Sequence, residues 1–177
     1  MSTNVKRLVY CAVSIALATA TGALTLFELP NGGSITPCSM LFATLPGFFF
    51  GPVYGLVSGV AYGVLSFVLK PYFYTPVQVS CDYVLAFGAL GLSGFFSNMK
   101  NGLYVGYIVS CLGRFVFAFI SGVAFFADYA PEGMNPAVYS ATYNISYIAV
   151  EMFLTIVIIA VPAVRNAIYR VKKQANS

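Results

Sequence analysis

A carboxylate and a phenol, Asp82-Tyr83, stand within the otherwise apolar stretch 76–87, and no lysine or arginine lies near them in that stretch. A charge at membrane depth costs about 2.5–3.5 kcal/mol, even on lenient insertion scales. Either a partner residue or a cationic, hydrogen-bonding ligand must offset that cost. The rest of the chain favours a ligand. The alternative is that Asp82 bonds to tyrosine hydroxyls within a packed core.

Other polar or small residues are predicted at a depth similar to that of Asp82. A rise of 1.5 Å per residue places Asp82 about 9 Å below the outer end of its predicted helix. Asn144 and Gly122 lie at similar depths below the outer ends of their own helices. Tyr139 lies one turn above Asn144, whereas Tyr143 is expected to point elsewhere. These positions could converge on one pocket that is open to the outside and closed below.

Aromatic residues reinforce this pocket. The chain has 16 Phe and 13 Tyr but no Trp. Tyr62 lies midway along its segment, and Phe126 approaches the outer end of another. Aromatic faces around a carboxylate suit a flat, cationic organic ligand. Each ring alone is also typical of a helix core or an interfacial belt.

Two further charges, Arg114 and Glu151, fall near the middles of apolar segments. Opposite charges at the same depth on adjacent helices suggest an ion pair. Such a pair would either fix helix packing or couple the helices during a conformational change.

The composition indicates an all-α, polytopic protein of the cell membrane, with a single domain over 1–177. The 177 residues are 59% hydrophobic and 8% charged, with a mean hydropathy of +0.84, whereas soluble domains carry about 25% charged residues. The net charge of +4 reflects basic residues near the two ends, which membrane topology explains without nucleic acid.

Ordinary enzyme chemistry and metal binding are not expected. The chain has no histidine, and its four cysteines stand singly. Phosphate-binding loops, Gly-x-Ser-x-Gly and HExxH motifs are all missing from the sequence, so we expect neither a cofactor nor ATP hydrolysis by this chain.

Six transmembrane helices are predicted from hydropathy, with proline and glycine at most of the joins. The segments cover 5–27, 36–50, 52–69, 76–96, 103–127 and 137–164. The second is short for a span and suggests a partly re-entrant helix. A cleaved signal peptide is the alternative for the first, because Lys6-Arg7 precedes an apolar run and Ala18-Thr19-Ala20, but that run is longer than a typical signal core.

The placement of Lys and Arg predicts cytoplasmic N- and C-termini. Among basic residues, the outside loops then hold only Lys70, and seven lie inside: Lys6, Arg7, Lys100, Arg165, Arg170, Lys172 and Lys173. This bias agrees with an even number of spans.

Small residues form a stripe on the first segment, at Ala12, Ala16 and Ala20. Spacing of four residues puts them on one helix face, where another helix can approach closely. The stripe serves either packing within the chain or docking of a partner subunit.

Several motifs resemble the thiamine-specific substrate-binding (S) component of energy-coupling factor (ECF) vitamin transporters. The resemblance spans essentially the whole chain, and its most specific part runs from Tyr129 to Asn144. The motifs are Leu29-Pro-Asn-Gly-Gly-Ser-Ile-Thr36, Pro76-Val-Gln-Val79 with Asp82-Tyr83, Phe119-Ile-Ser-Gly122, and Tyr129-Ala-Pro-Glu-Gly-Met-Asn-Pro136 followed by Tyr139 and Asn144.

The resemblance implies a six-helix fold that binds the vitamin near the outer face. The family's pocket residues would correspond to Asp82, Tyr83, Gly122, Phe126, Tyr139 and Asn144. The loop from Pro30 to Thr36, with Asn31, Gly32, Gly33 and Ser34, would act as a lid. Ala12, Ala16 and Ala20 would dock the transmembrane coupling subunit, which works with two ATPase subunits.

The chain also departs from the family pattern. Tyr62 and Phe126 stand where tryptophans occur in the family, and Ala118 falls near the place of a histidine. Stacking on Phe or Tyr is a weaker form of stacking on Trp, and losing the histidine removes one hydrogen bond. Thiamine is the expected ligand, and its pyrimidine or thiazole precursor is the alternative.

Two other functions are compatible with these residues. An ion-coupled secondary transporter of a small cationic or aromatic metabolite would use Asp82 and Glu151 as ion carriers, and it would transport without ATPase partners. A scaffold protein would use only the alanine stripe, and it would bind no small molecule.

Overall fold

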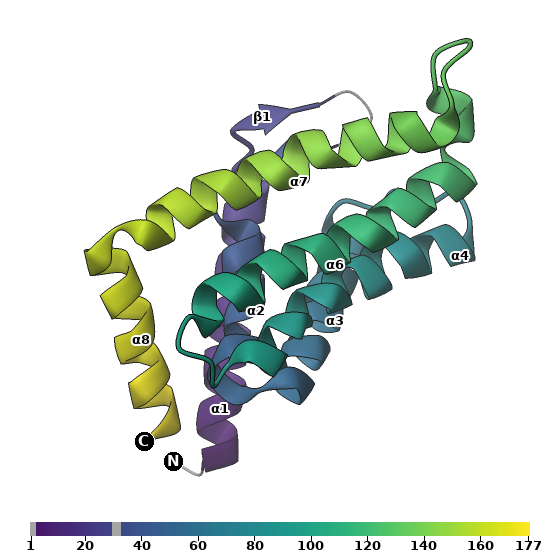
Figure 1. Cartoon of the computed structure of the whole chain (residues 1–177). Coiled ribbons are helices and arrows are strands. Elements are labelled where there is room, and N and C mark those ends of the chain that lie inside the picture. Colours follow the sequence, from purple (N-terminus) through teal and green to yellow (C-terminus); the bar gives the residue numbers. More distant parts are fainter. Residues whose placement is uncertain (1–2, 30–32) are drawn as a thin grey trace.

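The computed structural model describes residues 3–29 and 33–177. Long helices dominate the fold (Figure 1). The elements are α1 (Thr3–Ala23), β1 (Phe27–Glu28), β2 (Ser34–Ile35), α2 (Ser39–Phe50), α3 (Pro52–Leu69), α4 (Pro76–Val79), a π-helical turn (Ser80–Leu85), α5 (Ala86–Gly88), a 3₁₀ segment (Ala89–Phe96), α6 (Gly102–Phe125), a 3₁₀ turn (Ala127–Tyr129), α7 (Pro136–Ala160) and α8 (Pro162–Asn176).

The predicted all-α membrane architecture is confirmed. Within the described residues, five helical stretches are long and apolar enough to cross a membrane: 3–23, 52–69, 76–96, 102–125 and 136–160. The short second segment is α2, whose 12 residues extend only about 18 Å, less than the hydrocarbon thickness of about 30 Å.

α2 is the centre of the bundle. It packs against α1, α3, α6 and the 3₁₀ segment, and Phe48 near its C-terminal end is 1% exposed. A helix that is apolar all round is stable only when it is covered on all sides, which explains why so short a segment carries almost no polar residues.

Two predicted boundaries are wrong. The first helix ends at Ala23, after which the chain forms β1, which pairs antiparallel with β2. The last apolar run contains two helices, because Pro162 has no N–H and restricts the backbone of the preceding residue. Val161 accordingly takes an extended conformation (φ −63°, ψ 119°), and α8 turns back toward α1 and α2.

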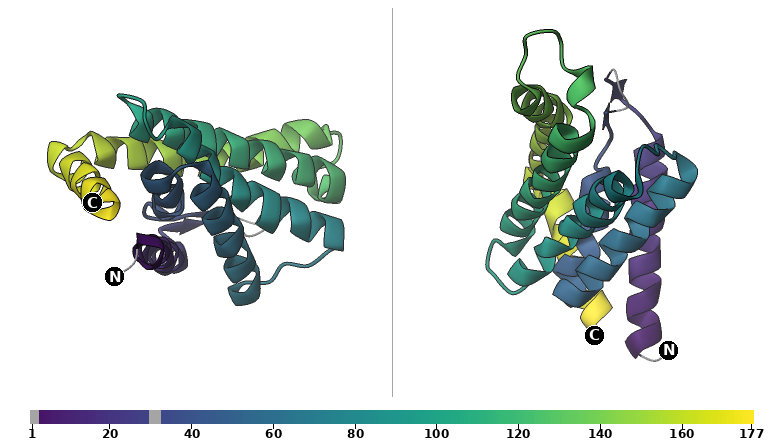
Figure 2. Two further views of the ribbon diagram at one scale, coloured as in Figure 1. Left: turned by 90° about the horizontal axis from the view of Figure 1, so that it is seen from below. Right: turned by 90° about the vertical axis from the view of Figure 1, so that its right-hand side faces the viewer.

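The two termini lie at one end of the molecule, as the predicted cytoplasmic N- and C-termini require. The ends marked N and C are neighbours in Figures 1 and 2, and the β1–β2 hairpin lies at the opposite end. A hydrogen bond from Lys6 Nζ to Ser177 Oγ (3.4 Å) joins them. The predicted cytoplasmic side is therefore the end away from the hairpin.

Glycines on α3 bring it close to the helical stretch 76–96. Gly55, Gly59 and Gly63 recur every four residues, a spacing that lets helices pack tightly in membranes. A Cβ added at Gly59 would lie 2.5 Å from the Phe87 carbonyl oxygen, and one at Gly63 would collide with the Tyr83 carbonyl. This contact positions the segment that carries Asp82.

Candidate functional site

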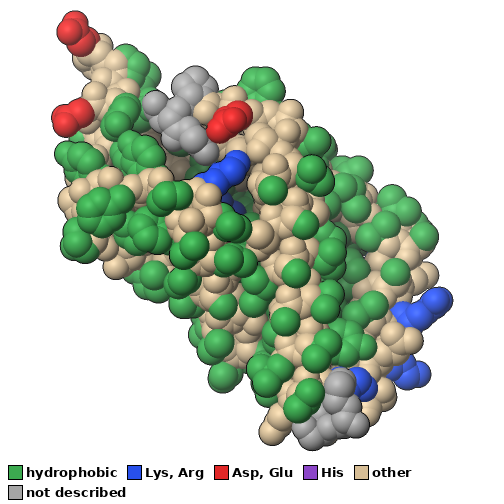
Figure 3. Space-filling view, turned by 180° about the vertical axis from the view of Figure 1, so that it is seen from behind, with side chains coloured by type: hydrophobic (Ala, Val, Ile, Leu, Met, Phe, Trp, Pro, Cys, Tyr) green, Lys and Arg blue, Asp and Glu red, His purple; other side chains and the backbone are tan. Residues whose placement is uncertain are grey.

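A cavity of about 530 Å³ opens at the end of the bundle opposite the termini. The outer ends of α1, α3, α6 and α7, the stretch 76–96 and the β1–β2 hairpin form its wall. Figure 3 shows the hollow in the surface, with basic side chains inside its rim and an acidic side chain beside it. Its size is typical of small-molecule sites.

Every predicted pocket residue lines this cavity. They are Tyr62, Asp82, Tyr83, Gly122, Phe126, Tyr139 and Asn144. Gly33 and Ser34 of the predicted lid line it as well, whereas Asn31 and Gly32 lie outside the described residues. Gly33 and Asn144, which are 111 positions apart in sequence, thus line the same cavity.

Asp82 receives a hydrogen bond from an amide within its own helix. The Gln78 Nε2 donates to Asp82 Oδ2 (2.6 Å), and Gln78 Oε1 in turn accepts from the Tyr74 backbone N–H (3.1 Å). Gln78 is 1% exposed. Sequence reasoning missed this partner, although its spacing of four residues is the usual signal for a helical pair. An amide satisfies one oxygen without cancelling the charge.

The π-helical turn presents Asp82 and Tyr83 to the cavity. Such turns insert an extra residue into a helix and often occur at functional sites. The Tyr83 hydroxyl donates to the Lys70 carbonyl (3.1 Å) and accepts from the Tyr72 N–H (3.2 Å). Tyr83 therefore fixes the linker between α3 and α4, which borders the cavity mouth.

Aromatic rings gather at the mouth around Phe126. Its ring centroid lies 5.7 Å from that of Tyr72 and 5.9 Å from that of Tyr129. The Tyr72 and Tyr129 hydroxyls are 3.0 Å apart and share a hydrogen bond, which is the main reason why the pKa of Tyr72 rises to about 12. This pair bridges the linker before α4 and the turn after α6.

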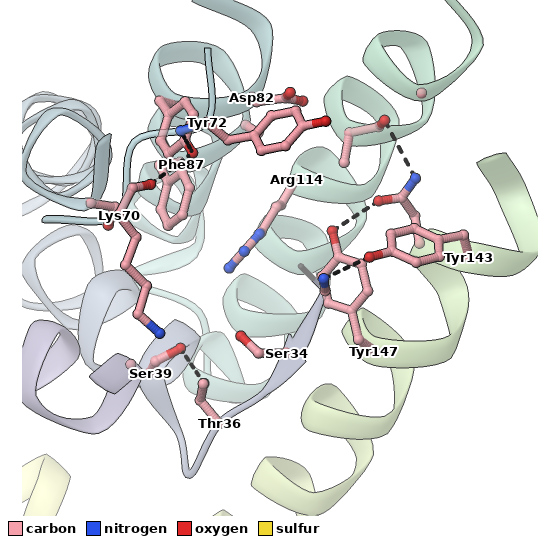
Figure 4. A pocket seen from close by; sticks show the side chains of 18 of the residues that line it. Ser34, Thr36, Ser39, Lys70, Tyr72, Asp82, Phe87, Arg114, Tyr143 and Tyr147 are labelled. Atoms are coloured by element: carbon pink, nitrogen blue, oxygen red, sulfur yellow. Dashed lines mark hydrogen bonds between the residues drawn. The ribbon is translucent and has the colours of Figure 1, made fainter. Parts of the chain in front are cut away.

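α7 presents a broad polar face to the cavity. The Asn144 side chain is buried, donates to the Ser140 carbonyl (2.9 Å) and accepts from the Tyr147 hydroxyl (2.8 Å). The prediction for Tyr143 is wrong: it lines the cavity, and its hydroxyl accepts from the Gly33 N–H (2.6 Å). Figure 4 shows Tyr143 and Tyr147 next to each other on this wall, each with a hydrogen bond drawn at its hydroxyl. Tyr143 thereby joins the hairpin to α7.

Gly122 and Tyr139 complete that wall. A Cβ at Gly122 would collide with the Ser140 hydroxyl, so this glycine lets α6 and α7 approach each other at the cavity. The Tyr139 ring stacks on that of Tyr143, with centroids 6.0 Å apart. The two rings provide an aromatic surface beside the hairpin.

The inner part of the cavity combines aromatic and basic groups. The Tyr62 hydroxyl donates to the Ala18 carbonyl (3.2 Å), and its ring lies edge-on to Phe87 with centroids 5.0 Å apart. The Arg114 guanidinium carbon lies 4.5 Å from the centroid of the Phe87 ring. Arg114 and Lys70 both line the cavity, and sequence reasoning had assigned neither to it.

Glu151 is bound by the entrance to α2. Its carboxylate accepts from the Thr36 N–H (3.3 Å) and hydroxyl (2.7 Å), the Ser39 hydroxyl (3.0 Å) and the Met40 N–H (3.0 Å). A carboxylate at a helix N-terminus is favoured by the helix dipole. Among the described residues, no ion pair joins Glu151 to Arg114, so the suggested pair is replaced by these two separate arrangements.

The alanine stripe faces away from the bundle. Ala12, Ala16 and Ala20 are exposed, while α1 buries Cys11, Ser14 and Ala18 against its neighbours. The stripe therefore does not serve helix packing within the chain. In the described part of the chain, no cluster of three His, Cys, Asp or Glu side chains could hold a metal ion.

These features define a multi-pass membrane protein built around a cavity of small-molecule size. The particular family follows from comparison: residues 8–170 match the model of the family described as thiamine transporter protein, and the chain belongs to this family. Its members are transporters, so the chain is not an enzyme, and it is a multi-pass protein of the bacterial cell membrane.

Curated relatives and a solved structure agree with this assignment. The thiamine transporter ThiT of Bacillus subtilis (strain 168) is 29% identical over 174 residues, which cover 89% of this chain and 90% of the relative. ThiT of Lacticaseibacillus paracasei is 26% identical over 160 residues, covering 78% and 80%. A structure of ThiT from Listeria monocytogenes has the same fold, with a TM-score of 0.78 at 21% identity over 92% of this chain and 98% of that one.

Proposed function

We propose that this chain binds thiamine from the outer side of the membrane, as the substrate-binding component of an ATP-driven ECF-type importer. The observation that carries the proposal is the convergence of the seven predicted pocket residues, from four membrane-spanning stretches, on one cavity. Membership of the thiamine transporter family supports thiamine over its two ring precursors.

The chemistry of the cavity wall fits the two rings of thiamine. Asp82 accepts a hydrogen bond from the Gln78 amide, and in its ionised form it can balance the thiazolium or accept an N–H of the aminopyrimidine. Phe126 and the tyrosines around it supply ring faces, which attract both aromatic and cationic groups. Asn144 and Tyr139 would provide directional hydrogen bonds, for which Asn144 would exchange part of its present bonding to Ser140.

Transport requires partners under this proposal. The sequence has no phosphate-binding loop, so the energy would come from two ATPase subunits through a membrane coupling subunit. The exposed stripe of Ala12, Ala16 and Ala20 offers a flat helix face for that subunit. Uptake by the chain reconstituted alone, driven by a proton or sodium gradient, would instead support an ion-coupled carrier.

Calorimetric titration of the purified chain with thiamine tests the binding site. The native chain should bind tightly and with one site. Asp82→Ala should weaken binding by about tenfold to a hundredfold, the range that a hydrogen bond to a charged group contributes. Asp128→Ala is the matched control, because Asp128 is exposed and does not line the cavity. Native-like affinity in a folded Asp82→Ala variant would refute the assigned site.

A further inference from the structure

The charged side chains of the sequence are separated between the two ends of the molecule. The five carboxylate side chains line the cavity or stand in the segment before α7: Glu28, Asp82, Asp128, Glu132 and Glu151. On the face drawn in Figure 3, acidic side chains lie at the end with the hollow, and most of the basic ones gather at the opposite end. The end that bears the termini is therefore positively charged, and it has no carboxylate side chain to balance that charge.

Arg7 of α1 is held by two aromatic rings at this positive end. Its guanidinium carbon lies 5.9 Å from the centroid of the Phe50 ring and 5.6 Å from that of the Tyr54 ring. Phe50 is the last residue of α2, Tyr54 lies in the first turn of α3, and their rings meet edge to face with centroids 5.5 Å apart. The Tyr10 ring of α1 also contacts that of Phe50 (6.2 Å). The rings thus place the guanidinium at a junction of three helices.

This arginine has no anionic partner among the described residues. Its Nε is buried without a hydrogen-bond acceptor, and its contacts in that part of the chain are the two rings. A guanidinium that stacks on aromatic rings can still offer its terminal amino groups to an anion. Its planar fork fits two oxygens of one phosphate group. Arg7 is therefore positioned for a phosphate-bearing ligand.

The position of Arg7 matches the depth of lipid phosphate groups. Arg7 lies four residues after the first residue of α1, about 6 Å along the helix axis. Helical side chains lean toward the helix N-terminus, so its guanidinium is directed toward the predicted cytoplasmic surface. Arginine and tyrosine at a helix end are typical of the membrane interface. Beside the cluster, Leu8 and Val57 are 63% and 65% exposed, and Val57 shares a helix face with Tyr54. These apolar side chains can contact acyl chains.

We propose that Arg7, Phe50 and Tyr54 form a headgroup site for an anionic phospholipid of the inner leaflet. The guanidinium binds the lipid phosphate through charge-assisted hydrogen bonds. A lipid with a net negative charge is preferred to a zwitterionic one, because the basic residues of this end repel a headgroup ammonium. Lys6 adds to this potential, since its ammonium donates to an uncharged group, the Ser177 hydroxyl (3.4 Å).

A lipid fits this site better than an acidic segment of a partner protein does. The cluster lies at the depth of the membrane interface, and exposed apolar side chains stand next to it. A phospholipid supplies a phosphate and acyl chains in the same molecule, whereas an acidic protein surface supplies carboxylates alone. The site lies at the end away from the cavity, so this inference does not depend on the proposed function.

Lipid titration of the full chain in detergent tests the headgroup site. Phosphatidylglycerol is compared with phosphatidylcholine of the same acyl chains. Native mass spectrometry counts the lipids bound to each chain, and circular dichroism follows thermal unfolding. Phosphatidylglycerol should bind at least tenfold more tightly than phosphatidylcholine and should raise the Tm more, because a ligand that binds the folded chain stabilises it.

Two arginine variants show whether Arg7 itself is the anchor. Arg7→Gln should weaken phosphatidylglycerol binding about tenfold or more, the contribution of a hydrogen bond to a charged group. Arg170→Gln is the matched control, because it makes the same change at an exposed position of α8, at the same end of the molecule. It should weaken binding less than about threefold. Arg7→Lys keeps the charge but loses the planar fork, and its affinity should lie between those of the native chain and Arg7→Gln.

Three results would overturn the headgroup site. Equal affinity of the native chain for the two lipids would show that headgroup charge is not recognised. Equal losses in Arg7→Gln and Arg170→Gln would show a diffuse attraction to the whole positive end. Glycerol phosphate, which has no acyl chains, should leave the Tm unchanged at the lipid concentrations used, and an equal rise would assign the site to free phosphates. If Arg7→Gln does not fold, Arg7→Lys decides, and native-like affinity in that variant would refute the role of the guanidinium.

Discussion

At the scale of single residues, the two carboxylates within the membrane-spanning segments, Asp82 and Glu151, have different roles. Asp82 has one amide partner and faces the cavity. Glu151 is 3% exposed and accepts four hydrogen bonds from the segment that follows the hairpin. A fully bonded carboxylate fixes structure, because each donor would otherwise be buried without an acceptor. We therefore propose that Asp82 contacts the ligand and that Glu151 supports the structure.

Glu151→Gln should destabilise the protein. The glutamine amide replaces one acceptor oxygen by an NH₂ group that faces the donors of α2 or of Thr36. Leaving such groups unsatisfied costs about 2–4 kcal/mol in total. Thermal unfolding in detergent, followed by circular dichroism, should show a clearly lower Tm.

The control for this variant is Glu132→Gln, an exposed residue in the loop before α7. It makes the same chemical change without a buried partner, so its Tm should equal that of the native chain. A Glu151→Gln variant as stable as this control would contradict the role that we give to Glu151.

At the scale of elements, the contact of α3 with the stretch 76–96 decides where Asp82 lies. Gly63→Ala would place a methyl group on the Tyr83 carbonyl. Alanine favours a helix over glycine by about 1 kcal/mol, but overpacking costs about 1–3 kcal/mol. The net effect on the free energy of unfolding should therefore be destabilising. We expect lower thermal stability together with weaker thiamine binding, because the π-helical turn must move.

Gly88→Ala is the matched control on the opposing helix. Its Cβ would meet only the end of the Val60 side chain, at 3.2 Å, and that side chain can adjust. Thermal unfolding and calorimetry should find this variant close to the native chain. If both alanines behave alike, the glycine contact does not position the site.

The helices show which parts of the fold could be predicted from the sequence and which could not. Hydropathy and proline or glycine at most of the joins located all six apolar segments, because a membrane requires long uncharged helices. The π-helical turn was not predicted, because hydropathy does not distinguish it from an α-helical turn. The break at Pro162 was signalled by the proline, but the apolar run continues across it and conceals it from hydropathy.

The residues of the cavity, like the helices, were predicted in part from the sequence. Polar residues inside apolar segments pointed to Asp82 and Asn144, because burial of such groups needs a reason. Tyr143 was misjudged because successive helix residues differ by about 100°, and the cavity-facing side of α7 is broad enough to include both Tyr143 and Asn144. Lys70 was counted only as a loop charge, since its place in the cavity wall is defined by tertiary structure.

At the scale of the whole molecule, the two ends have opposite characters. The termini and most basic residues lie at one end, and the cavity with its hairpin opens at the other. The positive-inside rule then predicts that the cavity opens to the outside. This orientation is a condition for uptake through the cavity, because an importer must receive its ligand from the outside.

Cysteine labelling in intact cells tests this orientation. Glu132→Cys lies on the exposed loop before α7, and Ser177→Cys lies at the C-terminus. A membrane-impermeant maleimide should modify Glu132→Cys in intact cells and Ser177→Cys only after the cells are permeabilised. The native chain is the control, because Cys11 and Cys111 are buried and Cys38 and Cys81 are partly buried. The reverse pattern would place the cavity on the cytoplasmic side, and it would exclude import through the site described here even if thiamine bound tightly to the purified chain.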